Sequence, residues 1–373
     1  MKKTKNKNKV SRPKALYIHI PFCSHICAYC DFCKMEYFSY IVDKYLPSLF
    51  KEIDSYNIKK LDTIYIGGGT PTSLSDAQLA SLLIHVFPLT KDVKEYTVEA
   101  NVENLTKSKL QLLKKYGVNR LSIGVESTDD NILKSINRVH TFSEVKRVIE
   151  EAKVVGFDNI NVDLILGLPG TTIKTIKNDL KNLLSLNVQH ISTYSLTIHP
   201  HTKFGVEGVE EVDEETSRRE YDLVHEILTI NGFDHYEISN FAKTGYQSMH
   251  NLTYWRDEQY YGVGLGASGY IGNIRYTNTK NINKYIANNY IDYREIVAKK
   301  DDEEYFIMLN LRTSEGIDDK KYINHFGYSF IEKHKEALAE FVESKLIKIE
   351  QGKVIATYDG MMVLDFLIKR FCA

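Results

Sequence analysis

The sequence predicts an α/β fold, in which a partial barrel of six strand–helix units is followed by a small α+β domain similar to a winged helix. Three observations predict it. Short apolar or β-branched runs alternate with helical patterns from residue 15 to about residue 197, as in parallel sheets and barrels. Six such units are too few to close an eight-unit barrel. Residues 301–373 instead show helical patterns around a short hairpin.

The alternating elements follow from apolar periodicity and from polar residues that begin helices. Ser75 precedes one helical pattern and Thr106 opens another. Strands are expected near residues 15–20, 62–66, 96–100, 120–125, 159–166 and 190–197. Helices are expected over residues 38–57, 75–87, 106–116, 129–155 (as two helices), 172–187 and 214–231.

The chain is expected to divide into four parts. Residues 1–14 form a basic, disordered tail, and residues 15–232 form the partial barrel. Residues 233–300, which are rich in Gly, Asn and Tyr, form a linking segment of loops and short strands. Residues 301–373 form the C-terminal domain. Its expected elements are helices over 302–312, 318–325, 328–344 and 358–371, with strands at 347–349 and 354–356.

Composition places the chain among soluble globular proteins and argues against bulk nucleic-acid binding. The 373 residues carry 48 Lys and Arg against 49 Asp and Glu, so no basic excess is left for a phosphate backbone. No run approaches 18 apolar residues and no signal-peptide pattern begins the chain, so we expect a cytoplasmic protein with reduced thiols. The seven Lys and Arg of residues 1–14 are expected to be solvated or, alternatively, to contact an anionic membrane surface.

Cysteines gather where the first predicted strand ends, which in a parallel barrel is the functional rim. Cys23, Cys27 and Cys30 have the spacing C-x3-C-x2-C. Three thiolates on one loop suit three irons of a 4Fe-4S cluster and leave the fourth iron open for the amino and carboxylate groups of S-adenosylmethionine. The alternative is a structural zinc site with Cys33 as fourth ligand, although zinc sites normally place two close cysteine pairs on separate knuckles.

A glycine run follows the second predicted strand. Residues 67–69 are not a phosphate-binding loop, since no Gly-Lys-Ser/Thr follows. Taken alone, the run indicates either a tight turn or a close approach of the backbone to a ligand. Beside the cysteine loop we favour a ligand, the methionyl amino group of S-adenosylmethionine. Residues 264–269 match G-x-G-x-x-G, but no strand–helix–strand unit is predicted around them, so nucleotide binding is not expected there.

Several short stretches, taken together, carry a family resemblance. They are YIHIPFC (17–23), CAYCDF (27–32), GGGTPT (67–72), VEAN (98–101), RLSIGV (120–125), NVDLILGLP (161–169), YSLT (194–197) and LNLRTSEG (309–316). They resemble the radical S-adenosylmethionine (radical SAM) superfamily and, more narrowly, the oxygen-independent coproporphyrinogen III oxidase family. The resemblance runs from about residue 15 into the C-terminal domain.

The resemblance implies roles for the residues that match family motifs. Cys23, Cys27 and Cys30 resemble the cluster ligands. The positions that match cofactor-binding residues are Tyr17, Tyr29, Gly68, Gly69, Thr70, Glu99, Glu126, Arg138 and Asp163. The chain departs from the family at Glu126, where Gln is usual, and Cys33 is an extra thiol that we do not expect to be a ligand.

Two features resemble the heme chaperone subgroup of this family. True oxidases have a fourth cysteine two positions after the third, where this chain has Phe32. Residues 250–255, HNLTYW, match the subgroup's H-N-x-x-Y-W signature, which implies heme binding through His250, Tyr254 and Trp255. Neutral imidazole is a good iron ligand. The alternative is a histidine and aromatic pair packed in the core.

The leading hypothesis is therefore a heme chaperone of the radical SAM type, which binds heme, a 4Fe-4S cluster and S-adenosylmethionine and delivers heme to acceptor enzymes. A homodimer and peripheral membrane contact are further expectations. Whether the protein is also an enzyme stays open at this point. The alternatives are oxidative decarboxylation of coproporphyrinogen III to protoporphyrinogen IX, and a zinc-stabilised binding protein.

Overall fold

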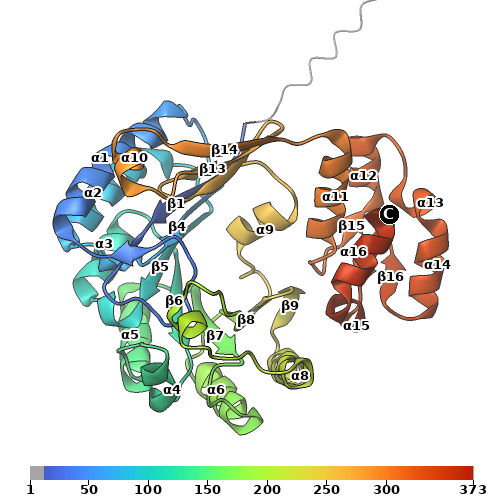
Figure 1. The fold of residues 1–373 in the computed structure, drawn as a ribbon, viewed down its shortest axis with the longest axis horizontal. Helices are drawn as coiled ribbons and strands as arrows, with labels where there is room; N and C mark the ends of the chain where they lie inside the picture. Colours follow the sequence, from blue (N-terminus) through green and yellow to red (C-terminus); the bar gives the residue numbers. More distant parts are fainter. Residues whose placement is uncertain (1–11, 373) are drawn as a thin grey trace, which may run out of the picture.

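A computed structural model describes residues 12–372, which form one large twisted sheet with helices around it and a separate C-terminal domain (Figure 1). The predicted tail lies almost entirely in residues 1–11, outside the described residues. The sheet has 12 strands in the order β14-β13-β12-β11-β1-β4-β5-β6-β7-β8-β10-β9. Its ends do not meet, so the prediction of a partial rather than a closed barrel is confirmed.

The centre of the sheet is the predicted run of six parallel strands. They are β1 (Ala15–Ile20), β4 (Thr63–Gly68), β5 (Glu95–Asn101), β6 (Arg120–Glu126), β7 (Ile160–Leu166) and β8 (His190–Ser195). The helices between them are α1 (Ser39–Ser55), α2 (Asp76–Val86), α3 (Lys107–Lys115), α4 (Asp130–Ser135), α5 (Phe142–Val155) and α6 (Ile173–Ser185). All of these elements lie within a few residues of the predicted ranges.

Helix starts follow from local capping. The Ser75 hydroxyl accepts a hydrogen bond from the Gln78 amide, and the Gln78 side chain returns a bond to the Ser75 amide, so both free donors are satisfied. Thr141 and Glu144 form the same reciprocal pair at the start of α5. Thr106 caps α3 through the Lys109 amide. These caps fix where the chain leaves each strand-end loop, and therefore where the loops of the rim stand.

Side chains alternate along the central strands between two environments. Apolar residues face the outer helices, where they form the main core; examples are Ile64, Val98, Ile123 and Val162. Their neighbours line the inside of the barrel and are mostly polar; examples are Tyr65, Glu99, Ser122 and Asp163. Because the side-chain period of a strand is two, the same strands hold a hydrophobic core on one face and a polar chamber on the other.

Residues 233–300, which we expected to be a linking segment, contribute strands to both ends of the sheet. After α7 (Lys203–Val206) and α8 (Glu214–Ile230), the hairpin of β9 (Asp234–Glu237) and β10 (Asn240–Ala242) joins β8. The chain then crosses through α9 (Met249–Trp255) to the opposite edge. There β11 (Tyr260–Val263) pairs with β1, followed by β12 (Ser268–Ile271), β13 (Ile274–Asn278), α10 (Ile282–Ile286) and β14 (Ile291–Ile296).

The C-terminal domain has a hydrophobic core of its own. Its sheet has the order β15-β17-β16, formed by β15 (Ile317–Asp318), β16 (Ile347–Glu350) and β17 (Lys353–Ala356). Its helices are α11 (Lys299–Asn310), α12 (Asp319–Phe326), α13 (Phe330–Lys333), α14 (Lys335–Glu343), α15 (Tyr358–Met362) and α16 (Leu364–Cys372). The helix expected over 328–344 is divided at His334, whose ring packs between Phe330 and Phe371.

The C-terminal domain is joined to the edge of the large sheet by backbone hydrogen bonds. The Ile238 amide donates to the Arg312 carbonyl at 3.1 Å, and the Ser314 amide donates to the Tyr236 carbonyl at 2.9 Å. Arg256, the residue after α9, forms an ion pair with Glu315. The end of α9 is therefore anchored to both the sheet and the C-terminal domain.

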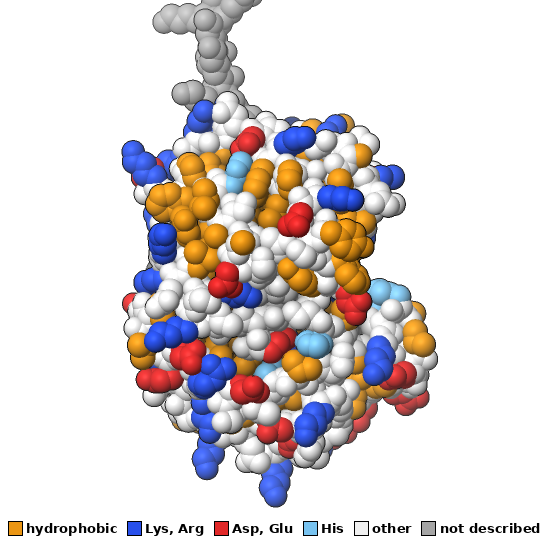
Figure 2. Space-filling view, turned by 90° about the vertical axis from the view of Figure 1, so that its left-hand side faces the viewer, with side chains coloured by type: hydrophobic (Ala, Val, Ile, Leu, Met, Phe, Trp, Pro, Cys, Tyr) orange, Lys and Arg blue, Asp and Glu red, His pale blue; other side chains and the backbone are white. Residues whose placement is uncertain are grey.

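The outer surface over α1 to α6 has no single charge sign. Seen from this side, basic and acidic side chains are interspersed, and hydrophobic side chains are more frequent in the upper part of the view (Figure 2). Large exposed side chains on α1, α2 and the turn that follows include Tyr40, Ile84 and Phe87. Within residues 12–372, none of the helices combines the length and the apolar character needed to span a bilayer.

Candidate functional site

The rim formed by the carboxyl ends of the strands holds a cavity of about 440 Å³. The structure brings most of the predicted site residues into its wall: Cys23, Cys27, Tyr29, Cys30, Gly68, Gly69, Thr70, Glu99, Glu126, Arg138 and Asp163. Tyr17, His250, Tyr254 and Trp255 do not line it. Cavity residues that sequence reasoning did not single out include Tyr65, Asn101 and Ser122.

Hydrogen bonds to the segment around residues 136–137 hold the cysteine loop in place. The Ala28 amide donates to the Ile136 carbonyl at 3.1 Å, and the Asn137 side chain donates to the Ile26 carbonyl at 2.6 Å. Thr70 places its hydroxyl 3.6 Å from the Cys23 sulfur. Burial raises the pKa of all three thiols, that of Cys23 to about 11. In the protein alone the thiols are therefore protonated, and bound iron would displace those protons.

The sulfur atoms of Cys23, Cys27 and Cys30 stand in one cavity wall. Among residues 12–372, no group of three Cys, His, Asp or Glu side chains is arranged to hold a metal ion. The chemistry of the donors nevertheless fits an iron–sulfur cluster, because three thiols stand on one short loop beside an open cavity. The fourth thiol, Cys33, lies elsewhere: a Cβ added to Gly266 would stand 2.8 Å from its sulfur, and Cys33 does not line the cavity.

The glycines at the end of β4 allow this strand to lie close to β1 and to the cysteine loop that follows it. Gly68 has a φ of +115°, and a Cβ there would lie 2.4 Å from the His19 ring. A Cβ on Gly69 would lie 2.8 Å from the Pro21 backbone and 3.0 Å from the Cys23 sulfur. The glycines therefore allow β4 to approach the cysteine loop closely, while their predicted approach to a ligand stays a prediction. Any side chain at Gly69 would push that loop away from the cavity.

The cavity carries more negative than positive charge. Four carboxyl side chains line it against two basic ones, and they are Asp31, Glu99, Glu126 and Asp163 against Lys34 and Arg138. Burial raises the pKa of Glu99 and raises that of Asp163 to about 7, with the nearby Glu126 adding to the shift of Asp163. Such a chamber favours a ligand that brings cationic groups.

Of the two Lys and Arg side chains that line the cavity, Lys34 donates to the Cys30 carbonyl, which leaves Arg138 for a ligand anion. Its side chain is buried and contacts Glu126, a residue held at a positive φ of +66° by a bulge in β6. Its Nε and Nη1 atoms are buried and have no hydrogen-bond partner among residues 12–372. Each of these donors points to a different side of the guanidinium, so a ligand carboxylate oxygen would satisfy one of them with a charge-assisted hydrogen bond.

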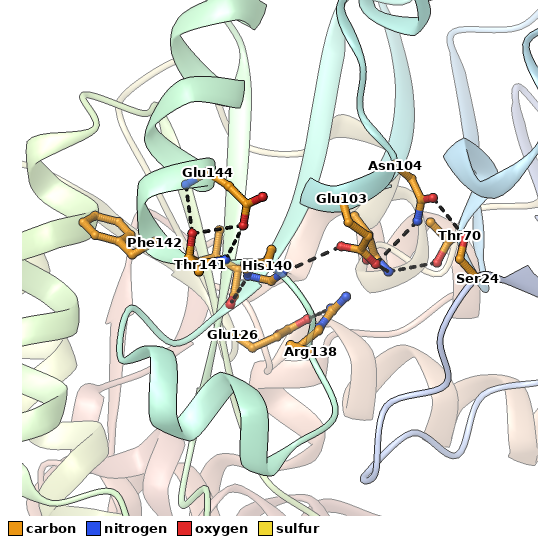
Figure 3. Close-up of polar contacts among 12 residues, drawn as sticks. Ser24, Thr70, Glu103, Asn104, Glu126, Arg138, His140, Thr141, Phe142 and Glu144 are labelled. Atoms are coloured by element: carbon orange, nitrogen blue, oxygen red, sulfur yellow. Dashed lines mark hydrogen bonds and ion pairs between the residues drawn. The ribbon is translucent and has the colours of Figure 1, made fainter.

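A polar network runs from His140, two residues after Arg138, to the cysteine loop (Figure 3). His140 lies 3.7 Å from the Glu103 carboxylate, and the neighbouring Asn104 accepts a hydrogen bond from Ser24 of the cysteine loop at 2.9 Å. Asn101 donates to Thr70 at 3.1 Å. Neither Glu103 nor His140 belongs to a motif, so sequence reasoning missed them; their positions just after β5 and just before α5 were the only available signal.

The signature residues 250–255 lie at the other end of the barrel. They form α9, which packs against the first residues of β4 and β5, whereas the cysteines stand beyond the last residues of the strands. Five residue steps of β4 separate the two levels, about 17 Å at 3.3 Å per residue. The structure therefore keeps the two predicted motifs apart, one at each end of the polar chamber.

We call the end of the barrel that carries α9 the lower end, and the cysteine-lined rim the upper end. His250 is enclosed at the lower end. Its Nδ1 lies 2.8 Å from the Thr63 hydroxyl and its Nε2 lies 2.7 Å from the Tyr254 hydroxyl. The side chain is 1% exposed, and burial lowers its pKa to about 3, so the ring is neutral. Trp255 packs against a small cluster formed by Tyr236, Ala242 and Leu252. In this conformation both ring nitrogens are occupied by protein partners.

The buried carboxylate of Glu95 holds the start of α9. Its oxygens accept hydrogen bonds from the Met249 amide at 2.8 Å, the His250 amide at 2.9 Å and the Ser248 hydroxyl at 3.3 Å. A carboxylate at a helix N-terminus is favoured by the unpaired amides and by the helix dipole. Glu95 was not predicted, because nothing in its local sequence distinguishes it from an exposed glutamate at a strand start.

Comparisons with known proteins agree with this geometry. Residues 17–183 match the family model of the Radical SAM superfamily, and residues 297–363 match that of the HemN C-terminal domain. The Heme chaperone HemW of Lactococcus lactis subsp. lactis is 39% identical, over 97% of this chain and 98% of the relative. The Heme chaperone HemW of Bacillus subtilis is 40% identical, over 94% and 97%.

A solved structure shares the whole fold. Coproporphyrinogen III oxidase (HemN) from Escherichia coli superimposes with a TM-score of 0.84, covering 97% of this chain and 90% of that one. Sequence identity to it is 21%, so the likeness concerns the fold. The similarity includes both the open sheet and the C-terminal domain, which is where the chain was expected to match.

Proposed function

The chain belongs to the family of the Heme chaperone HemW, within the radical SAM superfamily, and we propose that it binds heme, a 4Fe-4S cluster and S-adenosylmethionine and delivers heme to acceptor proteins. The observation that carries the proposal is the pairing of two sites in one barrel. A cysteine-lined, acidic cavity opens at one end of the strands, and the H-N-x-x-Y-W signature is built into the other.

Cys23, Cys27 and Cys30 would hold the cluster. When bound, the cluster supplies an open iron and an electron for the sulfonium of S-adenosylmethionine. The chain's own residues would hold that molecule by its charges. The Glu99 carboxylate suits the ammonium group, a free N–H donor of Arg138 suits the carboxylate, and Asp163 suits the ribose hydroxyls, which are donors.

His250 would supply the heme ligand. An iron needs the neutral imidazole with a free lone pair, and burial keeps the ring neutral at every physiological pH. The two hydrogen bonds to Thr63 and Tyr254 would have to open before an iron could bind. Tyr254 and Trp255 then offer aromatic surface for a porphyrin. Heme loading is therefore a conformational step in this proposal, rather than entry into an open pocket.

We also propose a cytoplasmic location, consistent with the reduced thiols that the cluster requires. The basic residues 1–14 would assist contact with an anionic membrane surface. A homodimer is the proposed assembly. Light scattering of the reconstituted protein tests the dimer, and co-sedimentation with vesicles rich in phosphatidylserine, with and without residues 1–14, tests the membrane contact.

The function is tested with the anaerobically reconstituted protein, which is given heme in one reaction and coproporphyrinogen III with S-adenosylmethionine in another. The proposal expects a heme Soret band, passage of that heme to an apo-acceptor such as apomyoglobin, and no protoporphyrinogen. Repeated turnover to protoporphyrinogen would instead establish an oxidase. Purification with one zinc and no iron would exclude both functions in favour of a zinc-stabilised protein.

A further inference from the structure

Tyr65, in the middle of β4, touches both sites at once. Its hydroxyl donates a hydrogen bond to Glu99 Oε1 at 2.7 Å, and its side chain forms part of the cavity wall. Its ring stacks on the His250 imidazole, with 5.1 Å between centroids and 28° between planes. A single, partly buried side chain therefore spans the distance between a carboxylate of the upper cavity and the histidine of the lower end.

The groups at each end of Tyr65 have few other partners. The second oxygen of Glu99 accepts the Gly68 amide at 2.9 Å, so Tyr65 takes the remaining half of that carboxylate. At the other end, Thr63 and Tyr254 occupy the edges of the His250 ring, and Tyr65 covers one face. His250 is thus enclosed by three side chains, of which only Tyr65 also reaches the cavity.

Tyr65 is also connected to the chain just beyond the cluster loop. Tyr17 lies beside it, with ring centroids 6.0 Å apart. The Tyr17 hydroxyl lies 2.9 Å from His19 Nδ1, and His19 Nε2 lies 2.7 Å from the Cys33 carbonyl oxygen. A chain of side-chain contacts therefore runs from the cysteine segment through Tyr17 and Tyr65 to His250.

We propose that Tyr65 is the positioning residue that couples ligand binding at Glu99 to the release of His250 for heme. This inference rests on the proposed function. A cationic group arriving at Glu99 competes with the Tyr65 hydroxyl for Oε1. Once that hydrogen bond is lost, the Tyr65 ring is free to shift, and the His250 face loses its cover. Binding of S-adenosylmethionine therefore strengthens heme binding, and heme strengthens binding of S-adenosylmethionine by the same factor.

The test is a set of anaerobic heme titrations, followed by the Soret band, with and without saturating S-adenosylmethionine. Wild-type protein is compared with Tyr65→Phe, which keeps the ring and removes only the hydroxyl. Tyr96→Phe is the matched control: Tyr96 stands on the adjacent strand, is 1% exposed, and its hydroxyl has no hydrogen-bond partner. Circular dichroism verifies that each variant is folded.

In wild type and Tyr96→Phe we expect heme to bind about tenfold more tightly when S-adenosylmethionine is present, within the usual range of coupling between sites. Tyr65→Phe is expected to bind heme with similar affinity in both conditions, near that of the cofactor-bound wild type. As a reciprocal measurement, equilibrium dialysis of S-adenosylmethionine with and without heme should give the same factor, and this readout needs no turnover.

Two results overturn the coupling while leaving heme binding intact. One is a wild-type heme affinity that does not change when S-adenosylmethionine is added. The other is a Tyr65→Phe variant in which S-adenosylmethionine still raises heme affinity about tenfold. A wild-type protein that binds no heme in either condition contradicts the proposed function itself, and the coupling fails with it. The titrations therefore separate failure of the coupling from failure of the function.

Discussion

The two ends of the barrel hold the two motifs in opposite states. At the upper end, Cys27 and Cys30 are partly exposed beside a cavity of about 440 Å³, and Arg138 has two donors without partners. At the lower end, every polar atom of His250 has a partner, and Glu95 secures the helix that carries it. The upper site is prepared for a ligand, and the lower one is closed.

This difference indicates an order of events. Unpaired buried donors cost free energy that a ligand can recover, so the upper cavity gains stability on binding. In the proposed heme complex, His250 would lose its hydrogen bonds to Thr63 and Tyr254, and heme binding would have to offset their cost. The same strands carry both states, since Thr63, which contacts His250, and Gly68, which lines the cavity, are the first and last residues of β4.

The largest expected effect is loss of the cluster from the cysteine-lined, upper end of the barrel. Serine in place of Cys23, Cys27 or Cys30 removes one of the three thiolates, so iron after reconstitution should fall from about four per chain to less than one. Cys33→Ser, which alters a thiol outside the cavity, should keep the cluster. Iron analysis and the absorption spectrum measure both. Loss of iron in Cys33→Ser equal to that in the other three would contradict the assignment of ligands.

The next largest effect concerns the lower end of the barrel, where Glu95 holds the start of α9. Glu95→Ala leaves three buried donors of α9 without an acceptor, which should lower the free energy of unfolding by about 3 kcal/mol. Because α9 is then less firmly held, heme should associate faster. Urea unfolding and stopped-flow heme binding measure the two results. The exposed Glu343→Ala serves as control and should stay within about 0.5 kcal/mol of wild type.

A pH-dependent effect on the free energy of unfolding is expected from Asp163, one of the carboxyl groups of the upper cavity. The pKa of Asp163 is raised from 3.8 to about 7, mainly by burial, so the folded protein keeps a proton that the unfolded chain releases. Stability from this group is therefore lost as pH rises from about 4 to about 7. Asp163→Asn should match wild type near pH 4 and exceed it at pH 8 by up to about 4 kcal/mol, at about 1.4 kcal/mol per unit of pKa shift.

Unfolding curves across this pH range test the sign of the Asp163 effect. The exposed Asp158→Asn is the control and should differ from wild type by no more than about 0.5 kcal/mol at any pH. A stability gain for Asp163→Asn at pH 4 that vanishes at pH 8 would show that the carboxyl is charged and stabilising in the folded protein, against the burial argument.

Local patterns in the sequence were sufficient for the central strands, the helix starts and the rim. Strand ends in a parallel sheet meet at one edge, so Cys23, Glu99 and Asp163 could be placed together without a structure. The reciprocal cap at Ser75 is likewise a local signal, and the structure has it. Each of these features depends on residues close together in the chain.

The features that escaped prediction depend on contacts between distant segments. Residues 233–300 have weak periodicity, and their strands are defined by pairing with β8 and β1, which no local pattern specifies. Glu95 acts on residues 248–250, more than 150 positions away. Tyr65 follows the alternation of β4 and so was predictable as an interior residue, but its contact with His250 requires knowing where α9 lies.

The most direct test of the account is the heme affinity of His250→Ala, measured by anaerobic titration of the reconstituted protein. His190→Ala is the matched control, because His190 is also buried with both ring nitrogens engaged, but stands outside the signature. The account predicts that His250→Ala weakens heme binding at least about tenfold, whereas His190→Ala leaves it unchanged. Equal heme affinity in wild type and His250→Ala would contradict the assignment of the lower end of the barrel as the heme site.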